Sequence, residues 1–218
     1  MKRSVFIIGG SLAYQNMFTL EGWQTVDSVQ QADLVQFTGG EDVDPSFYGA
    51  RKHPKTGSNP IRDGIEKRFF DAANYAGVPM AGICRGGQFL NVMNGGKMYQ
   101  HVDKHAIPGT HEVMDKITGE LYQATSTHHQ MMVPTREADI IAVAYGLSTK
   151  RELERGGKMI TIYGPNPDAE VLYYRKTNSL CFQPHPELPG QVSLRSRYFK
   201  YIEDLLLTNK RDEQCAVS

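Results

Sequence analysis

The sequence predicts an α/β fold with a largely parallel sheet, and three observations support this prediction. Short apolar runs occupy residues 4–8, 34–38 and 78–83. A charged stretch with apolar residues at helical spacing, 61–76, separates the last two runs. Glycines accompany the ends of these runs, and in open α/β sheets such turns gather at the carboxyl edge of the strands, where ligands bind. The order of segments is therefore typical of strands connected by helices.

The second half of the chain carries further strand and helix patterns. We expect strands at 139–145 and 158–163, a hairpin of 169–175 with 179–183, and a final amphipathic helix at 192–207. No internal repeat, low-complexity segment or linker divides the chain. Residues 1–208 are therefore expected to form a single domain, followed by a polar tail at 209–218.

The composition argues against several classes of protein. The chain of 218 residues has 24 Lys and Arg and 24 Asp and Glu, so its formal net charge is zero, which argues against a nucleic-acid partner. No apolar stretch approaches the length of a membrane span, and the N-terminal apolar run is too short for a signal-peptide core. The three cysteines, Cys84, Cys181 and Cys215, show neither metal-type spacing nor an even disulfide framework. We therefore expect a cytoplasmic protein with no membrane association.

Cys84 is the strongest candidate for a reactive residue. It is the centre of a Gly-x-Cys-x-Gly pattern between the strand at 78–83 and a helix-like segment that begins near Gln88. A nucleophile on a tight strand-to-helix turn needs small neighbours, because the backbone bends sharply there and the side chain must stand clear. The N-terminus of the following helix stabilises a thiolate. The alternative is a buried structural cysteine, since free cysteines are commonly small core residues.

His185 and Glu187 supply the groups that a nucleophilic cysteine needs. They lie two residues apart in a Pro-His-Pro-Glu segment that follows the strand at 179–183. Cysteine catalysis requires a base to accept the thiol proton and a third group to orient that base. A carboxylate next but one to the histidine can bond the far ring nitrogen, and the prolines restrict the backbone that holds both. The combination predicts a Cys-His-Glu triad of Cys84, His185 and Glu187.

These motifs, together with three others, resemble the class I glutamine amidotransferases and their hydrolase relatives. The segments that carry the resemblance are 38–49 (TGGEDVDPSFYG), 62–66 (RDGIE), 82–88 (GICRGGQ), 126–130 (STHHQ) and 185–187 (HPE). They occur in family order over most of the chain and are most similar to the γ-glutamyl hydrolase branch, peptidase family C26. The resemblance implies a flavodoxin-like three-layer sandwich with a mostly parallel central sheet and an added antiparallel hairpin.

The resemblance also implies a role for each matching residue. Cys84 would be the nucleophile, His185 the general base and acid, and Glu187 the orienting carboxylate. Backbone N–H groups of Gly40 and Arg85 would form the oxyanion hole, since attack on an amide carbonyl develops a negative oxygen that needs donors. The residues expected to help hold the small γ-glutamyl substrate are Gln88, His128, His129 and Gln130.

Two groups of polar residues have alternative interpretations. Arg62, Asp63 and Glu66 are predicted to be structural, either as a solvated helix face with local pairing or as part of the rim of the site. His128 and His129 are adjacent, so in a strand their side chains would point to opposite faces. No Cys or carboxylate stands at a ligand-like offset from them. We therefore expect no metal and no cofactor.

The predicted function is hydrolysis of a γ-glutamyl amide, either glutamine or a γ-glutamyl amine, through a thioester on Cys84. The first alternative is a glutaminase subunit that delivers ammonia to a separate synthetase chain. Strict amidotransferases usually have a histidine at the position of Gly87, which speaks against this alternative. The second is a catalytically silent binding module of the same fold, which the intact triad residues argue against. The leaving amine stays open, as does a homodimer.

Overall fold

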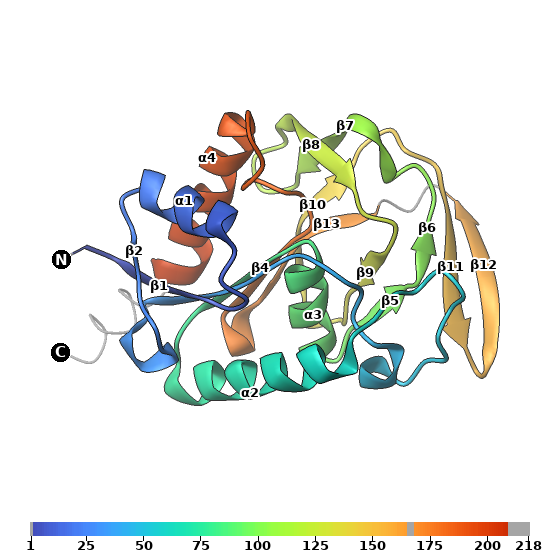
Figure 1. The fold of residues 1–218 in the computed structure, drawn as a ribbon. Coiled ribbons are helices and arrows are strands. Elements are labelled where there is room, and N and C mark those ends of the chain that lie inside the picture. The colour runs from blue at the N-terminus through green and yellow to red at the C-terminus, as the bar shows by residue number, and fades with distance from the viewer. Residues whose placement is uncertain (1, 165–167, 209–218) are drawn as a thin grey trace.

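The computed structural model describes residues 2–164 and 168–208, with helices packed on both faces of a large mixed sheet (Figure 1). The polar tail expected at 209–218 lies outside the described residues. The helices are α1 (Leu12–Leu20), α2 (Pro60–Ala76), α3 (Arg85–Met93) and α4 (Val192–Tyr201). A π-helical segment, Ile202–Leu207, continues α4, so this region covers the final helix predicted from the sequence.

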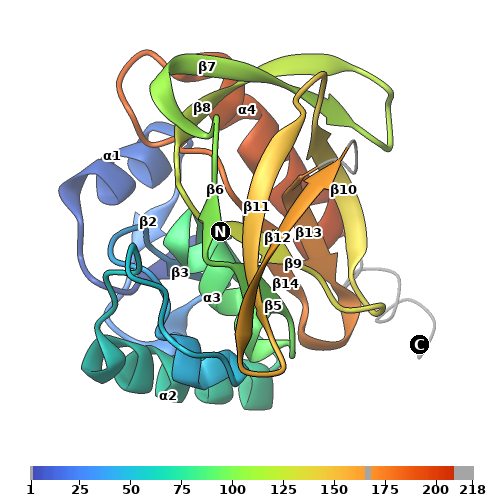
Figure 2. The same ribbon diagram turned by 90° about the vertical axis from the view of Figure 1, so that its right-hand side faces the viewer.

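The strands form one large and one small sheet. The strands of the large sheet are β1 (Ser4–Ile7), β2 (Gln24–Thr25), β3 (Leu34–Phe37), β4 (Met80–Ile83), β5 (Lys97–Tyr99), β7 (Ala106–Asp115), β8 (Leu121–Thr127), β9 (Met131–Val133), β10 (Asp139–Ala144), β13 (Ala169–Tyr174) and β14 (Ser179–Phe182). The strands of the small sheet are β6 (His101–Val102), β11 (Thr149–Arg155) and β12 (Lys158–Gly164). Figure 2 shows β11 and β12 as a long hairpin beside the large sheet.

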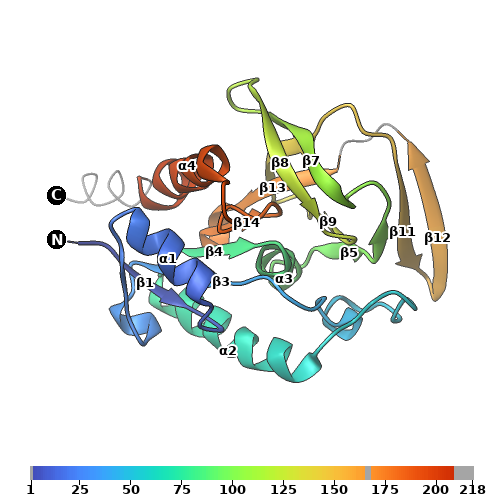
Figure 3. The ribbon, with the colours of Figure 1, turned by 45° about the horizontal axis from the view of Figure 1, so that its top comes forward.

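The large sheet is parallel at one end and antiparallel at the other. Its strand order is β2-β1-β3-β4-β14-β13-β10-β7-β8, with β9 paired to β13 and β5 to β9. Strands β2, β1, β3, β4 and β14 run parallel, whereas the pairings from β14 onward are antiparallel. The predicted α/β fold with parallel central strands is confirmed, and the predicted hairpin is β13–β14. The antiparallel part extends beyond this hairpin, because β10, β7 and β8 continue the sheet (Figure 3).

Helices on both faces explain why the parallel strands are buried along their whole length. On one face, α1 and α4 contribute Phe18, Leu194 and Tyr198 to the core. On the other, α2 and α3 contribute Phe70 and Phe89. All residues of β3, β4 and β14 are buried, as expected for strands between two helical layers. The arrangement is the three-layer sandwich that the sequence predicts. Within residues 2–164 and 168–208, no helix combines the length and apolar character that a membrane span requires.

Local signals in the sequence set the ends of α2. The side chain of Asn59 accepts a hydrogen bond from the backbone N–H of Arg62 at 3.2 Å, which caps the helix. Pro60 follows at the first helical position, where its missing N–H costs nothing. Gly77 ends the helix with φ +64°, the left-handed conformation that glycine adopts most easily. The predicted end of this helix is confirmed, and its length brings Arg62 beneath the turn that follows β3.

Two glycines allow the chain to turn sharply from β4 into α3. A Cβ atom on Gly82 would lie 2.3 Å from the carbonyl group of Gly86. A Cβ atom on Gly86 would lie 2.3 Å from the carbonyl oxygen of Phe37 in β3. Both distances are far below van der Waals contact, so a side chain at either position would push the helix away from the sheet. The turn around Cys84 therefore depends on these glycines.

We expect Gly86→Ala to lower the free energy of unfolding by about 1–3 kcal/mol or more, because the new methyl group meets backbone that cannot move aside. The matched control is Gly64→Ala in α2, where no atom lies within 4 Å of the added Cβ. That variant should gain roughly 0.5–1 kcal/mol, because alanine is the better helix former. Urea unfolding of both variants measures the difference, and equal stabilities would contradict the tight packing of the turn.

Candidate active site

Cys84 lies on the strained turn between β4 and α3. Its backbone angles are φ 51° and ψ −115°, a conformation that non-glycine residues rarely adopt and that costs about 1–3 kcal/mol. Its backbone N–H donates to the carbonyl oxygen of Phe182 at 2.8 Å, so β14 holds the turn in place. The residue is 9% exposed and lines a cavity. The thiol is thus presented to a cavity at the N-terminal end of a helix.

His185 and Glu187 lie beside Cys84 in the loop after β14. Nδ1 of His185 is 2.7 Å from Oε1 of Glu187, and the imidazole also hydrogen-bonds Cys84. The backbone N–H of His185 donates to Oγ1 of Thr125 in β8 at 2.8 Å. Burial lowers the pKa of His185, but the hydrogen bonds with Cys84 and Glu187 raise it by more, to about 10. His185 is therefore an imidazolium at neutral pH, and its charge favours a thiolate on Cys84.

Tyr14, on α1, belongs to this site and was missed in the sequence. Its buried hydroxyl accepts a hydrogen bond from the backbone N–H of Gly39 at 2.9 Å. Burial and the negative charge of Glu187 raise the pKa of Tyr14 well above its ordinary value, so the hydroxyl keeps its proton beside that carboxylate. Tyr14 therefore connects the turn after β3 to the group that orients His185. Helical spacing of apolar residues around Tyr14 could have indicated α1, but not the contact with Glu187.

Gly39 and Gly40 bring the backbone of the turn after β3 close to the reactive groups. A Cβ atom on Gly39 would lie 3.2 Å from Cε1 of His185 and 3.2 Å from the hydroxyl of Tyr14. Gly40 has φ +137°, and a Cβ atom there would lie 2.3 Å from the guanidinium of Arg62. That guanidinium in turn donates to the carbonyl oxygen of Gly39 at 3.0 Å. The glycine pair is thus required both by conformation and by close packing.

A buried ion cluster fixes the start of α3 against α2. The side chain of Arg85 is 2% exposed and forms ion pairs with both Asp63 and Glu66. Glu66 also accepts from Nε of Arg62 at 2.8 Å, and Asp63 accepts from the backbone N–H of Asp44 at 2.8 Å. Asp63 and Glu66 are buried, so they do not form a solvated helix face. They belong to the rim of the site, which is the second of the two alternatives drawn from the sequence.

A cavity of about 290 Å³ lies beside Cys84. Its lining includes all residues predicted for the oxyanion hole and for the substrate, namely Gly40, Arg85, Gln88, His128, His129 and Gln130. Three charged residues that the sequence analysis did not single out for the site, Glu41, Asp42 and Lys55, also line it. The cavity therefore presents side chains of both signs next to the reactive thiol.

The amide nitrogens of Gln88 and Gln130 are used within the protein. Nε2 of Gln88 donates to the backbone carbonyl of Gln130 at 3.2 Å and to Oε1 of Gln183 at 3.0 Å. Nε2 of Gln130 donates to Oγ1 of Thr56 at 3.1 Å. Oε1 of Gln130 is buried and has no hydrogen-bond partner among the described residues. A ligand could therefore bond these two side chains through their carbonyl oxygens.

The adjacent residues His128 and His129 lie in different environments. Nε2 of His129 is 3.2 Å from Oδ1 of Asp42, and this hydrogen bond raises the pKa of His129. His128 is buried, and burial lowers its pKa well below the ordinary value. The pair therefore does not bind one ligand jointly. His129 with Asp42 faces the cavity, whereas His128 reaches a second polar cluster behind it.

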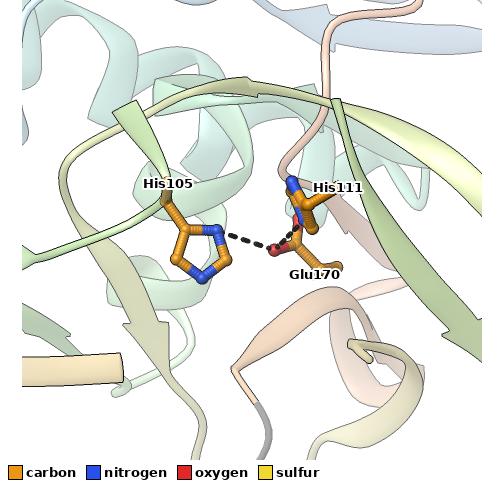
Figure 4. A group of neighbouring side chains, drawn as sticks. All are labelled: His105, His111 and Glu170. Carbon is orange, nitrogen blue, oxygen red and sulfur yellow. Dashed lines mark hydrogen bonds and ion pairs between the residues drawn. The ribbon is translucent and has the colours of Figure 1, made fainter. Parts of the chain in front are cut away.

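That second cluster contains His105, His111 and Glu170 (Figure 4). Within the part of the chain that the structure describes, these residues form a group whose ligand atoms all lie within 4.8 Å of one another, close enough to hold a metal ion. The sequence analysis singled out none of the three. They come from distant parts of the chain, so their spacing along it gives no metal signal.

We expect Glu66→Gln to lower the free energy of unfolding by about 3–5 kcal/mol, because it leaves part of the buried charge of Arg85 uncompensated. The matched control on the same helix is Asp71→Asn, which breaks the exposed pair with Lys67 and should cost less than about 1 kcal/mol. Urea unfolding measures both. Similar losses in the two variants would contradict the structural role of the buried cluster.

We expect Glu187→Gln to lower the pKa of His185 from about 10, because the lost carboxylate no longer stabilises the imidazolium. The folded state should also lose a stabilising contribution that is complete at low pH and disappears as the pH rises through the folded pKa. NMR titration of the imidazole measures the shift. Glu41→Gln, which removes a carboxylate that lines the cavity, is the control. An unchanged His185 pKa in Glu187→Gln would contradict the assignment.

Known proteins with this fold include glutamine amidotransferases and a chain of a GMP synthase. The GMP synthase chain, from Thermoplasma acidophilum, matches with coverage of 98% of both chains, a TM-score of 0.66 and 14% identity. A glutamine amidotransferase from Thermotoga maritima matches 99% of this chain and 93% of its own, with a TM-score of 0.60 and 15% identity. At these identities the likeness concerns the fold alone.

Similar sequences carry related names. A glutamine amidotransferase-like protein of Lactococcus lactis, YvdE, is 35% identical over 133 residues, which cover 52% of this chain and 56% of that protein. A protein of Mycobacterium tuberculosis named as a glutamine amidotransferase is 47% identical over 66 residues, which cover 30% of this chain and 21% of that protein. The matches thus span about half the length of these relatives or less.

The sequence profile of the peptidase C26 family matches residues 18–153. The matched region includes Cys84 and ends before His185 and Glu187, so their place beside the thiol comes from the structure. The match covers more than half of the chain, and the fold agrees with it. The chain belongs to the peptidase C26 family, within the class I glutamine amidotransferase-like superfamily.

Proposed function

We propose that this chain hydrolyses a γ-glutamyl amide with Cys84 as the nucleophile. The observation that carries the proposal is the contact of Cys84 with the imidazole of His185, which Glu187 orients at 2.7 Å. A thiolate beside an imidazolium is the activated form in cysteine hydrolases. Cys181, by contrast, is fully buried, and burial raises its pKa far above the ordinary value, so it has no such role.

The proposed reaction begins with attack of the Cys84 thiolate on the carbonyl carbon of the amide. The N–H groups of Gly40 and Arg85 stabilise the negative oxygen. The C–N bond then breaks, the leaving amine takes a proton from His185, and a thioester remains on Cys84. Water attacks this thioester, His185 accepts its proton, and the C–S bond breaks to release the acid. Each step uses groups that line the cavity or touch Cys84.

The charges in the cavity suit a γ-glutamyl group. Such a group carries an α-carboxylate and an α-ammonium at the end remote from the scissile bond. Lys55 and His129 could pair with the carboxylate, and Glu41 and Asp42 with the ammonium, since all four line the cavity. The hydrogen bond to Asp42 raises the pKa of His129, which favours its positive form. The carbonyl oxygen of Gln88 is a further acceptor for the ammonium.

The alternative proposal is a glutaminase subunit that works with a synthetase chain. It is favoured by the fold likeness to PurLQS from Thermotoga maritima, which has a TM-score of 0.61 and 14% identity. Gly87 speaks against it, because a Cβ there would lie 2.8 Å from the backbone nitrogen of Phe182. The histidine usual at this position in strict amidotransferases would need a different packing of α3 on β14.

An amine-release assay distinguishes the two proposals. The purified chain is offered glutamine, γ-glutamyl amines and γ-glutamyl peptides, and the released ammonia or amine is quantified. Turnover of a γ-glutamyl amine or peptide by the chain alone supports the hydrolase. Release of ammonia from glutamine that rises only when a synthetase is added supports the glutaminase of a two-chain enzyme.

We expect Cys84→Ala to abolish turnover and to prevent trapping of a γ-glutamyl thioester, because no other described thiol contacts His185. A glutamine-analogue electrophile should add its mass to Cys84 in the unmodified chain, as located by peptide mapping. Cys215→Ser is the matched control and should keep both labelling and turnover. Retained turnover in Cys84→Ala would rule out the mechanism, and absence of labelling in an intact chain would favour a silent binding module.

A further inference from the structure

A set of three histidines and one glutamate lies buried behind the cavity. We call His105, His111, His128 and Glu170 the histidine cluster. His105 precedes β7, His111 lies within β7, His128 follows β8, and Glu170 lies on β13. All four side chains are at most 3% exposed. Burying so many ionisable groups costs free energy unless they are paired or bind a metal.

The distances within the histidine cluster match those between the ligands of one metal ion. Oε1 of Glu170 lies 3.0 Å from Nε2 of His111, 3.4 Å from Nδ1 of His105 and 3.8 Å from Nε2 of His128. Ligands in a tetrahedral zinc site with bonds of about 2.0–2.1 Å lie roughly 3.3 Å apart. Figure 4 shows the rings of His105 and His111 turned toward the same carboxylate oxygen. Small side-chain shifts would give all four a common ion.

The remaining ring nitrogens have the partners that metal-bound histidines use. Nε2 of His105 lies 3.0 Å from Oδ2 of Asp168, and Nδ1 of His111 lies 2.9 Å from Oγ of Ser126. Asp168 is itself held by Thr149 at 2.7 Å. A carboxylate or hydroxyl that accepts the outer N–H fixes the tautomer whose other nitrogen faces the metal. In that tautomer His105 and His111 both aim a lone pair at Glu170.

Without a central cation, those lone pairs are poorly compensated. If neutral His105 donates to Asp168, its Nδ1 lone pair faces a carboxylate oxygen. Nδ1 of His105, both ring nitrogens of His128 and Oε2 of Glu170 have no hydrogen-bond partner among the described residues. The ion pairs of Glu170 among these residues are all with histidines. Several buried acceptors thus surround one point, where a dication would satisfy them together.

We propose that the histidine cluster binds one zinc-type divalent transition-metal ion, with His105, His111 and Glu170 as ligands and His128 as the fourth. Three imidazole nitrogens and one carboxylate oxygen suit zinc and its neighbours in the first transition row, and do not suit magnesium or calcium. Four protein ligands close the coordination sphere, so the ion has a structural role. It ties β7 and the end of β8 to β13 of the central sheet.

His128 connects this metal site to the candidate active site. It lines the cavity that contains Cys84, and Nε2 faces Glu170 in the cluster. An ion bound to His128 would fix the cavity wall on which His129 and Gln130 follow. Metal removal should therefore loosen this wall without removing any group that contacts the thiol. The proposal does not depend on the reaction that Cys84 performs.

Metal binding is tested directly on the untagged chain, because an oligohistidine tag would bind zinc itself. The protein is treated with a chelator, equilibrated with Zn²⁺ and separated from free metal, and bound zinc is measured by mass spectrometry of the element. The same measurement on Cys84→Ser excludes a site made by the reactive thiol. We expect one zinc per chain in both proteins. Substituting Co²⁺ should give the intense visible absorption of a four-coordinate site, and Mg²⁺ should not compete.

Variants locate the site. Glu170→Gln and His111→Asn should lose zinc retention, whereas Asp168→Asn should weaken zinc binding by about 10–100-fold, because it removes a carboxylate that orients His105. His101→Gln is the matched control, since its ring bonds Lys55 and lies outside the cluster. It should retain one zinc per chain.

Two results would overturn the proposal. One is Cys84→Ser protein that retains no zinc and gives no four-coordinate cobalt spectrum. The other is full zinc retention in both Glu170→Gln and His111→Asn, which would place the ion elsewhere. The cobalt spectrum is recorded on Cys84→Ser protein with the cluster intact, so it decides the matter even if a cluster variant fails to fold. Circular dichroism of each variant identifies such a failure.

Discussion

The buried ion cluster of Arg85, Asp63 and Glu66 is the interaction on which the geometry of the site depends. Arg85 is the first residue of α3, directly after the thiol-bearing turn, and both of its carboxylate partners lie on α2. Arg62, which also pairs with Glu66, reaches on to the carbonyl oxygen of Gly39. Three segments that are far apart in the sequence are thereby held in one arrangement. Such a cluster is costly to desolvate, so its value lies in fixing geometry.

The strained turn at Cys84 is stabilised by its surroundings. β14 accepts the backbone N–H of Cys84, and glycines let α3 approach β3 and β4 more closely than any side chain would permit. The adjoining loop supplies His185, whose raised pKa places a positive charge beside the thiol. Tyr14 and Glu187 complete this arrangement from opposite ends of the chain. Backbone strain and buried charge therefore occur together where the chemistry is proposed.

The antiparallel strands do more than extend the sheet. β7, β8 and β13 carry a second concentration of buried polar groups behind the cavity, and His128 belongs to both regions. The parallel part of the sheet supplies the thiol and its partners, whereas the antiparallel part supplies the opposite wall of the cavity. A metal in the histidine cluster would make that wall rigid. This division explains why the strands beyond β13 are relevant to the site.

The sequence by itself determined the α/β fold, the Cys84 turn and the motif containing His185 and Glu187, because glycine patterns, apolar runs and short motifs are local signals. It also determined the end of α2 at Gly77. Only the tertiary structure decided that Asp63 and Glu66 are buried, that Tyr14 approaches Glu187, and that histidines from separate strands share one carboxylate. Each of these contacts joins segments distant along the chain. Strand order and helix packing create them, and no spacing in the sequence encodes them.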